Sequence, residues 1–229
     1  MQPPIPAHQR DTSGLTELDA HLLAGPTATG TPVQSNSLSR LDVQLFGRRS
    51  ERTPGHASLQ RAVDVVAPLL TATAEWTAED GYVERQTYVP SAGARHPFTA
   101  LILHRSGDAP HQAWAVSPAK ALLRFEVTSH QPRVDAILTA ARDALRTAEP
   151  PSTLLVVLAR FRRTLSKYAD GHTLVWRDAG VFLGAAHLVA ESLNLRSCIA
   201  GIAETTAFPL AGTSDPLVDV GALALSERD

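Results

Sequence analysis

The stretch Phe161-Arg-Arg-Thr-Leu-Ser-Lys-Tyr168 stands between a leucine-rich run at residues 153–161 and a long apolar segment at residues 175–193. The run is typical of a buried strand. The later segment has no polar face, which is typical of a helix buried in the core or at a subunit interface. Lys167 and Tyr168 are therefore expected at the rim of the core. A partly desolvated lysine, or a tyrosine beside it, can act as a general acid or base, although a surface lysine next to an amphipathic tyrosine is the commoner arrangement.

The spacing of apolar residues predicts the other elements. Pro132 suits the first turn of a helix at residues 132–147. Ser58 can cap a further helix, whose apolar residues share one face: Leu59, Ala62, Val63, Val66 and Leu70. Short β-branched or leucine-rich runs predict strands at residues 99–104, 112–116, 124–127 and 218–225. Because strands and helices interleave without a strict βαβ repeat, the sequence predicts the α+β class.

Composition excludes several classes of function. Of the 229 residues, 44% are hydrophobic and 19% are charged, and the net charge is -2. Because the basic residues are scattered, neither nucleic acid nor an acidic membrane surface is expected as a partner. The N-terminus has no signal-peptide pattern, and no apolar run approaches the ~20 residues of a membrane span. A cytoplasmic protein is expected.

Composition also divides the chain into two regions. Residues 1–40 are rich in Pro, Ser and Thr and contain only a brief apolar patch. Such a segment buries too little apolar surface to offset its conformational entropy, so we expect it to be loosely ordered. Residues 41–229 carry the predicted helices and strands and are expected to form the folded domain.

Two further segments could bind a ligand. Arg48-Arg-Ser-Glu-Arg52 combines guanidinium groups with a hydroxyl, a set that suits phosphate oxygens, although taken alone the segment is more simply explained as a solvated basic turn. In Pro90-Ser-Ala-Gly-Ala-Arg-His-Pro97 two prolines bracket small residues, and Gly93 gives the backbone freedom to approach a flat ligand. The alternative for this second segment is a plain connection into the strand that follows.

Common catalytic and metal-binding motifs are absent from the sequence. The nine histidines form no His-Glu-x-x-His motif and no pair at i, i+4, so no metal site is expected. The single cysteine, Cys198, excludes a disulfide framework and lies in an apolar stretch typical of a small buried residue. There is no glycine-rich dinucleotide loop, no P-loop and no Gly-x-Ser-x-Gly elbow.

Taken in this order, the segments resemble the nitroreductase superfamily of FMN enzymes, in particular its SagB/McbC-type branch, the azoline dehydrogenases of ribosomal peptide biosynthesis. Lys167-Tyr168 is similar to the Lys-Tyr motif of that branch. The implied cofactor-binding residues lie in three segments. They are Arg48, Arg49, Ser50 and Arg52 in the N-terminal FMN clamp, Pro90, Ser91, Ala92 and Gly93 in the Pro-Ser-Ala-Gly segment, and Ala200 and Gly201 in a turn similar to Ile-Gly-Gly-Phe.

This resemblance implies a fold, a cofactor and a reaction. The fold would be a mixed sheet wrapped by helices, in an intertwined homodimer with two FMN sites at the subunit interface. The reaction would be the oxidation of thiazoline or oxazoline rings of a peptide to thiazole or oxazole, with Lys167 or Tyr168 as the base. The implied partners are an azoline-containing peptide and a cyclodehydratase.

Several positions depart from the pattern of the family. Where the family has a histidine and a Gln-Asn pair after Ala179-Gly180, this chain has Val181-Phe-Leu-Gly184, and one glycine of the later turn is replaced by Ala200. The basic residues near the C-terminus are reduced to Arg228. Two alternatives therefore stay open: an NAD(P)H-dependent FMN reductase of nitro compounds or quinones, and a flavin-less scaffold that binds a biosynthetic partner or a leader peptide.

Overall fold

The computed structural model describes residues 49–52, 55–79, 81–116, 122–125, 130–203, 205–208 and 215–228. The predicted N-terminal segment of residues 1–40 and the expected clamp residue Arg48 lie outside these ranges. Among the described helices, none combines the length and the apolar character needed to cross a membrane.

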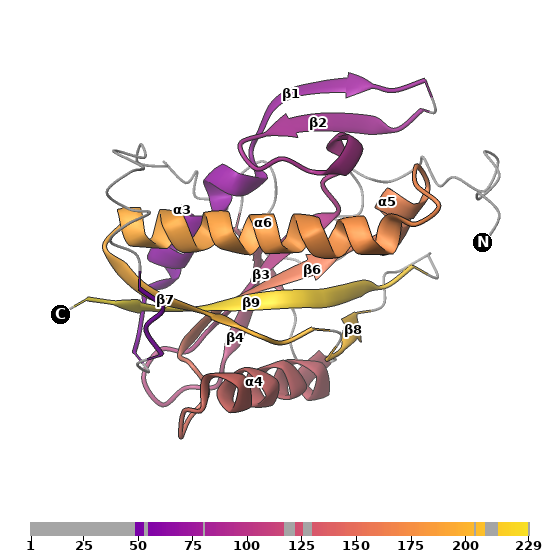
Figure 1. Ribbon diagram of the computed structural model, residues 1–229. Coiled ribbons are helices and arrows are strands. Elements are labelled where there is room, and N and C mark those ends of the chain that lie inside the picture. The colour runs from indigo at the N-terminus through magenta and orange to yellow at the C-terminus, as the bar shows by residue number, and fades with distance from the viewer. Residues whose placement is uncertain are drawn as a thin grey trace.

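A seven-stranded sheet forms the centre of the molecule (Figure 1). Its strands are β3 (Phe98–His104), β4 (Gln112–Val116), β5 (Leu122–Phe125), β6 (Thr153–Ala159), β7 (Leu195–Ala200), β8 (Ala207–Phe208) and β9 (Leu217–Glu227). They follow the order β5-β4-β3-β6-β9-β7, with β8 paired to β9, and these pairs are antiparallel. A parallel bridge between Ser50 and Ser197 makes the sheet mixed. The predicted α+β fold with a mixed sheet is confirmed.

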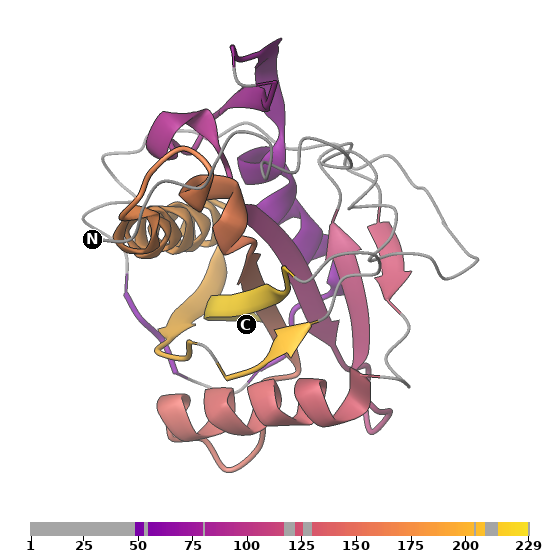
Figure 2. The ribbon, with the colours of Figure 1, turned by 90° about the vertical axis from the view of Figure 1, so that its right-hand side faces the viewer.

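Helices cover both faces of this sheet, as Figures 1 and 2 show. Helices α3 (Leu59–Leu70) and α6 (Gly171–Ser192) lie on one face, and α4 (Gln131–Leu145) lies on the other. One apolar core fills the space between α3, α6 and the sheet, and a second fills the space between α4 and the sheet. Strand β6 is buried along its whole length because both of its faces are covered, which explains its unbroken apolar sequence.

Most of the predicted elements are present with shifted ends. Ser58 caps α3, since its Oγ accepts a hydrogen bond from the backbone N–H of Arg61 at 3.4 Å. The strand predicted to reach Phe161 ends two residues earlier, and Phe161 begins the short helix α5 (Phe161–Leu165). Strand β5 begins two residues before the predicted strand 124–127, whose last two residues lie outside the described ranges.

Helix α6 is not buried on all sides within the chain, so the prediction of a core position is wrong. One face packs on the sheet through residues such as Phe182 and Ala186, but Val181 on the opposite face is 46% exposed. An added Cβ at Gly180 or Gly184 would meet no atom within 4 Å. Within the described part of the chain, the helix belongs to an outer layer and packs through the face that carries Phe182 and Ala186. The alternative, a subunit interface, stays a prediction.

Helix α6 approaches strand β9 closely at Gly221. This glycine has φ 146°, beside a register shift in the ladder between β6 and β9. An added Cβ would overlap the side chain of Leu183 from α6. Gly221 therefore provides both the backbone conformation and the space that let the helix pack on the sheet.

A hairpin of β1 (Ala72–Thr77) and β2 (Val83–Thr87) forms a separate two-stranded sheet, which projects from the side of the molecule that carries α6 (Figure 1). The sequence analysis did not predict this hairpin. Its outer strand β1 is exposed along most of its length, so the residues lack the apolar alternation that marks a strand packed on a core.

Candidate functional site

Lys167 and Tyr168 lie in the turn between α5 and α6. Both of their backbone N–H groups donate to the carbonyl oxygen of Thr164, each at 3.1 Å, so the end of α5 fixes the turn. The side chain of Lys167 is 34% exposed. Its Nζ donates to Glu84 Oε1 at 2.7 Å and to the carbonyl oxygen of Gly93 at 3.4 Å.

The loop of residues 90–93, named here the Ser91 loop, is held on α6 by Asp178. The Ser91 hydroxyl donates to Asp178 Oδ2 at 2.7 Å, and the Ala92 N–H donates to the same oxygen at 2.8 Å. Ser91 Oγ also accepts a hydrogen bond from the N–H of His96 at 3.0 Å. These bonds give the loop one defined position, with Pro90 exposed at its start.

Lys167 and Tyr168 lie directly against the Ser91 loop at Gly93. Gly93 has φ 59°, and an added Cβ there would lie 3.0 Å from Lys167 Nζ and would overlap the Tyr168 hydroxyl. Both the backbone conformation and the available space therefore call for glycine. The fold brings an ammonium group and a phenol to a loop of small residues that is 74 positions away from Lys167 in the sequence.

A buried carboxylate, Glu84, completes this cluster. It is only 7% exposed, and its pKa is lowered by the hydrogen bond from Lys167, which outweighs the opposing effect of burial. Its second oxygen, Oε2, accepts a hydrogen bond from Trp76 Nε1 at 3.0 Å. The fully buried Arg95 places Nη2 3.9 Å from Glu84 Oε1 and stacks its guanidinium 4.4 Å from the ring centroid of Tyr82.

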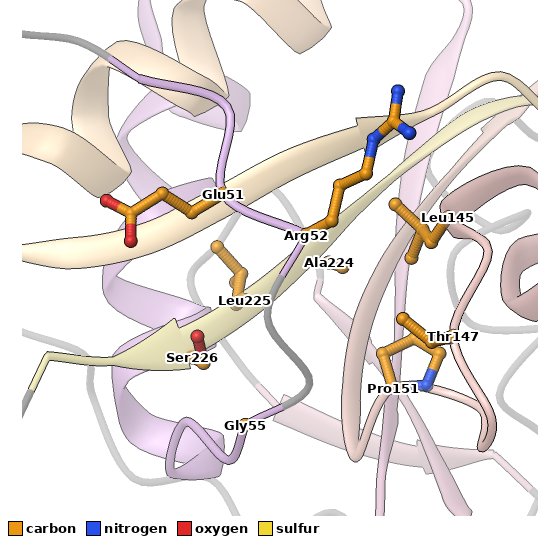
Figure 3. A pocket seen from close by; sticks show the side chains of 9 residues that line it. All are labelled: Glu51, Arg52, Gly55, Leu145, Thr147, Pro151, Ala224, Leu225 and Ser226. Atoms are coloured by element: carbon orange, nitrogen blue, oxygen red, sulfur yellow. The ribbon is translucent and has the colours of Figure 1, made fainter.

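The segment of residues 49–52, named here the clamp, runs beside β7. Glu51 N–H donates to the carbonyl oxygen of Ser197 at 3.1 Å, next to the bridge that Ser50 makes. Arg49, Ser50 and Arg52 are exposed. Figure 3 shows Glu51 and Arg52 extending away from one another.

Two further arginines lie beside the clamp and are paired with acids. Glu51 carboxylate oxygens lie 3.2 Å from Arg196 Nε and 3.4 Å from Arg228 Nη2. Arg228 also lies 2.7 Å from Glu191 Oε2. The last basic residue of the chain thus reaches the clamp, where it shares the carboxylate of Glu51 with Arg196.

A small hollow lies beside the clamp, lined by residues that include Arg52, Leu145, Pro151 and Ser226 (Figure 3). Its volume is about 10 Å³, which is close to the least that one water needs. A second hollow of about 30 Å³ lies next to Ser91, between α3, β2 and Phe182. Neither of these two hollows could enclose a flavin ring.

The clamp and the Ser91 loop lie toward opposite ends of α6. Asp178 contacts the loop, and Glu191 contacts Arg228 beside the clamp. With a rise of ~1.5 Å per residue, these two positions are about 20 Å apart along the helix. One chain therefore does not bring the two predicted halves of the cofactor site together.

The other predicted cofactor residues, Ala200 and Gly201, follow the end of β7. Ala200 is buried in the core between the sheet and α4, as is Cys198, so only its backbone could contact a ligand. Gly201 is exposed, with open space where a side chain would lie. Among the described residues, no group of three His, Cys, Asp or Glu side chains could hold a metal ion.

Sequence reasoning missed Glu84 and Asp178. An acidic residue in an apolar helix was a usable signal for Asp178, because a buried carboxylate needs donors. Glu84 gave no such signal, since it stands in a short polar stretch whose hairpin was not predicted.

The fold is similar to that of solved nitroreductases over most of the chain. A proposed nitroreductase from Ralstonia eutropha matches with a TM-score of 0.58 at 14% identity, over 88% of this chain and 89% of that one. A chain of the E. coli microcin synthetase McbBCD complex with truncated pro-MccB17 bound matches with a TM-score of 0.54 at 15% identity, over 100% of this chain and 84% of that one.

A proposed nitroreductase from Anabaena variabilis gives a TM-score of 0.53 at 19% identity, over 85% of this chain and 40% of that much longer chain. No protein-family model and no curated protein matches the sequence. The class defined by these comparisons is structural: the chain has the nitroreductase fold.

Proposed function

We propose that this protein is an FMN-dependent oxidoreductase that oxidises thiazoline or oxazoline rings of a ribosomally made peptide to thiazole or oxazole. The observation that carries the proposal is the contact of Lys167 and Tyr168 with Gly93, which places two proton-handling groups on a loop of small residues. The nitroreductase fold supports it, and so does the similarity to a chain of a microcin synthetase complex.

The reaction removes a hydride and a proton from the ring, which becomes aromatic. FMN, when bound, supplies the acceptor for the hydride. The chain has to position the peptide ring and take the proton from its α-carbon. Lys167 and Tyr168 are the candidates for this step, because their polar atoms reach the one point of the Ser91 loop where no side chain intervenes.

The clamp and the Ser91 loop together fit FMN when they come from two copies of the chain. Arg49 and Arg52 offer exposed guanidinium groups that match phosphate oxygens, with Ser50 between them. The Ser91 loop offers close backbone approach for the ring. Because these halves lie toward opposite ends of α6, an antiparallel packing of two α6 helices around Gly184 would bring the clamp of one copy to the Ser91 loop of the other.

We propose such a homodimer, with the exposed apolar face of α6 at its interface. Val181→Asp is expected to give a monomer in light scattering and to lose bound FMN, since both halves of each site come apart. Thr139→Asp, on the exposed face of α4, is the matched control and should change neither property. A dimeric Val181→Asp protein would contradict this arrangement.

The function is tested first by the visible spectrum of the purified protein and the mass of any released cofactor. A yellow protein that releases FMN is expected, and it should oxidise an azoline peptide more readily than it oxidises NADPH. Lys167→Ala and Tyr168→Phe should retain FMN while turnover falls about 100-fold or more. Rapid NADPH oxidation without azoline oxidation would instead identify a nitro or quinone reductase.

A flavin-less scaffold is the second candidate, favoured by one observation. Glu51 places a carboxylate inside the clamp and pairs with Arg196 and Arg228, which reduces the positive charge available to a phosphate. A colourless protein that takes up no added FMN would support this candidate, with a leader peptide or a cyclodehydratase as its partner. In the oxidase, Glu51→Gln is expected to tighten FMN binding.

A further inference from the structure

We propose that Glu84 is a positioning residue that fixes the Lys167 side chain on the Ser91 loop, where its charge acts on the substrate electrostatically. The inference rests on the proposed function for the roles of Lys167 and Tyr168. It adds a third residue to them, contributed by the hairpin of β1 and β2.

The geometry of Glu84 commits both of its oxygens to donors. Oε1 accepts from Lys167 Nζ at 2.7 Å, and Oε2 accepts from the indole N–H of Trp76 at 3.0 Å. Hydrogen bonds donated to both oxygens of a carboxyl group favour its ionised form. The lowered pKa of Glu84 has the same origin, the hydrogen bond from Lys167.

The burial of Glu84 makes the charge on Lys167 important to the fold. A buried carboxylate is costly unless cations and hydrogen-bond donors accompany it. Arg95 is the second cation, but its Nη2 lies 3.9 Å away, beyond hydrogen-bond distance. Loss of the Lys167 proton would remove the close cation and leave the carboxylate with the distant one.

A lysine held as an ammonium cannot accept a proton, so its role is electrostatic. The Lys167 charge lies against the same point of Gly93 as the Tyr168 hydroxyl, where it would stabilise negative charge that develops on the substrate.

The chain offers a direct test of how Lys167 is held because it contains two lysines, Lys120 and Lys167. A Lys120→Arg background labelled with carbon-13 at lysine Cε leaves a single lysine signal. With Glu84 present, carbon-13 relaxation should show that the Lys167 side chain is ordered, and in Glu84→Gln the same side chain should become mobile. Glu75→Gln is the matched control, since Glu75 is a carboxylate of the same hairpin that pairs with Arg85 instead.

This readout needs neither flavin nor substrate, so its failure is distinguishable from a failure of the proposed function. Equal mobility of the Lys167 side chain with and without Glu84 would overturn the inference even in an active oxidase. Glu84-dependent order of Lys167 in a colourless, inactive protein would support the pairing and reject the oxidase.

Turnover provides a second test, of the role assigned to Lys167. Lys167→Arg keeps a cation beside Glu84 but cannot act as a base. We expect it to retain azoline turnover at least about tenfold above Lys167→Ala, and Glu84→Gln to lower kcat and shift the pH profile while Glu75→Gln does neither. Equal loss of turnover in Lys167→Arg and Lys167→Ala would identify Lys167 as the base and overturn its electrostatic role.

Discussion

Asp178 accepts the hydroxyl hydrogen of Ser91 across 87 positions of sequence, at 2.7 Å, from a buried position in helix α6. The same carboxylate oxygen accepts the N–H of Ala92 at 2.8 Å. The Ser91 loop is therefore anchored to the longest of the described helices, and its Gly93 is held in a fixed position against Lys167 and Tyr168.

Replacement of Asp178 is expected to destabilise the protein through this anchor. Asp178→Ala leaves two donors without their acceptor and should lower the free energy of unfolding by about 3 kcal/mol, measured by urea denaturation. Asp178→Asn should cost less, because one amide oxygen can accept both bonds that Oδ2 accepts now. Asp135→Ala on the exposed face of α4 should change stability by no more than about 0.5 kcal/mol.

Gly93→Ala is expected to impair the candidate site more than the fold. Both Gly93 and Gly107 have φ 59°, so alanine at either should cost about 1–2 kcal/mol of backbone strain. Only at Gly93 would the new methyl group displace the Tyr168 hydroxyl and Lys167, since Gly107 has no atom within 4 Å of that position. Azoline turnover should fall in Gly93→Ala and persist in Gly107→Ala. Equal turnover in the two variants would argue against a catalytic role for this contact.

Gly221→Ala is expected to be the most destabilising of the glycine substitutions. It combines a backbone conformation that alanine rarely adopts with an overlap against Leu183, and these effects together should cost about 3 kcal/mol or more. Thermal and urea unfolding would measure the loss. Gly201→Ala, where a side chain has open space, is the control. A Gly221→Ala protein as stable as the control would mean that α6 moves off β9 without cost.

Acidification is expected to destabilise the fold as the pH falls below about 6.5. Burial lowers the pKa of His96, His104, His111 and His130 from the ordinary value of 6.5. Just below pH 6.5 the unfolded chain therefore binds more protons than the folded chain. The free energy of unfolding then decreases as the pH decreases. Urea denaturation at about pH 7.5 and about pH 5.5 should show the loss, with a smaller loss in His96→Gln. Stability that stays constant on acidification would contradict the prediction.

Much of the fold could be predicted because local sequence and burial agree over its central elements. Strand β6 is apolar without interruption, as expected of a strand covered on both faces, and α3 combines a serine cap with an apolar face. Helix α6 was predicted as a helix but not with its exposed side. Its sequence is apolar all round, and sequence does not distinguish a surface that the chain buries from one left open to a second copy.

The candidate site was predictable where its residues form compact motifs. The Ser91 loop and Lys167-Tyr168 are short segments, and the structure places them in contact, although their roles remain predictions. Glu84 was not predictable, because it joins the cluster through the hairpin fold and through hydrogen bonds from Trp76 and Lys167. Neither was the pairing of Glu51 with Arg196 and Arg228, which depends on residues from three separate parts of the chain.

The placement of the clamp and the Ser91 loop toward opposite ends of α6 has a genetic consequence for a shared site. A chain lacking the clamp arginines Arg49 and Arg52, and a chain carrying Lys167→Ala, would each form inactive dimers. A mixed dimer would contain one site with both an intact clamp and an intact lysine. Equal mixing of the two inactive proteins, followed by subunit exchange, should restore about a quarter of the sites, so two defective alleles would complement each other.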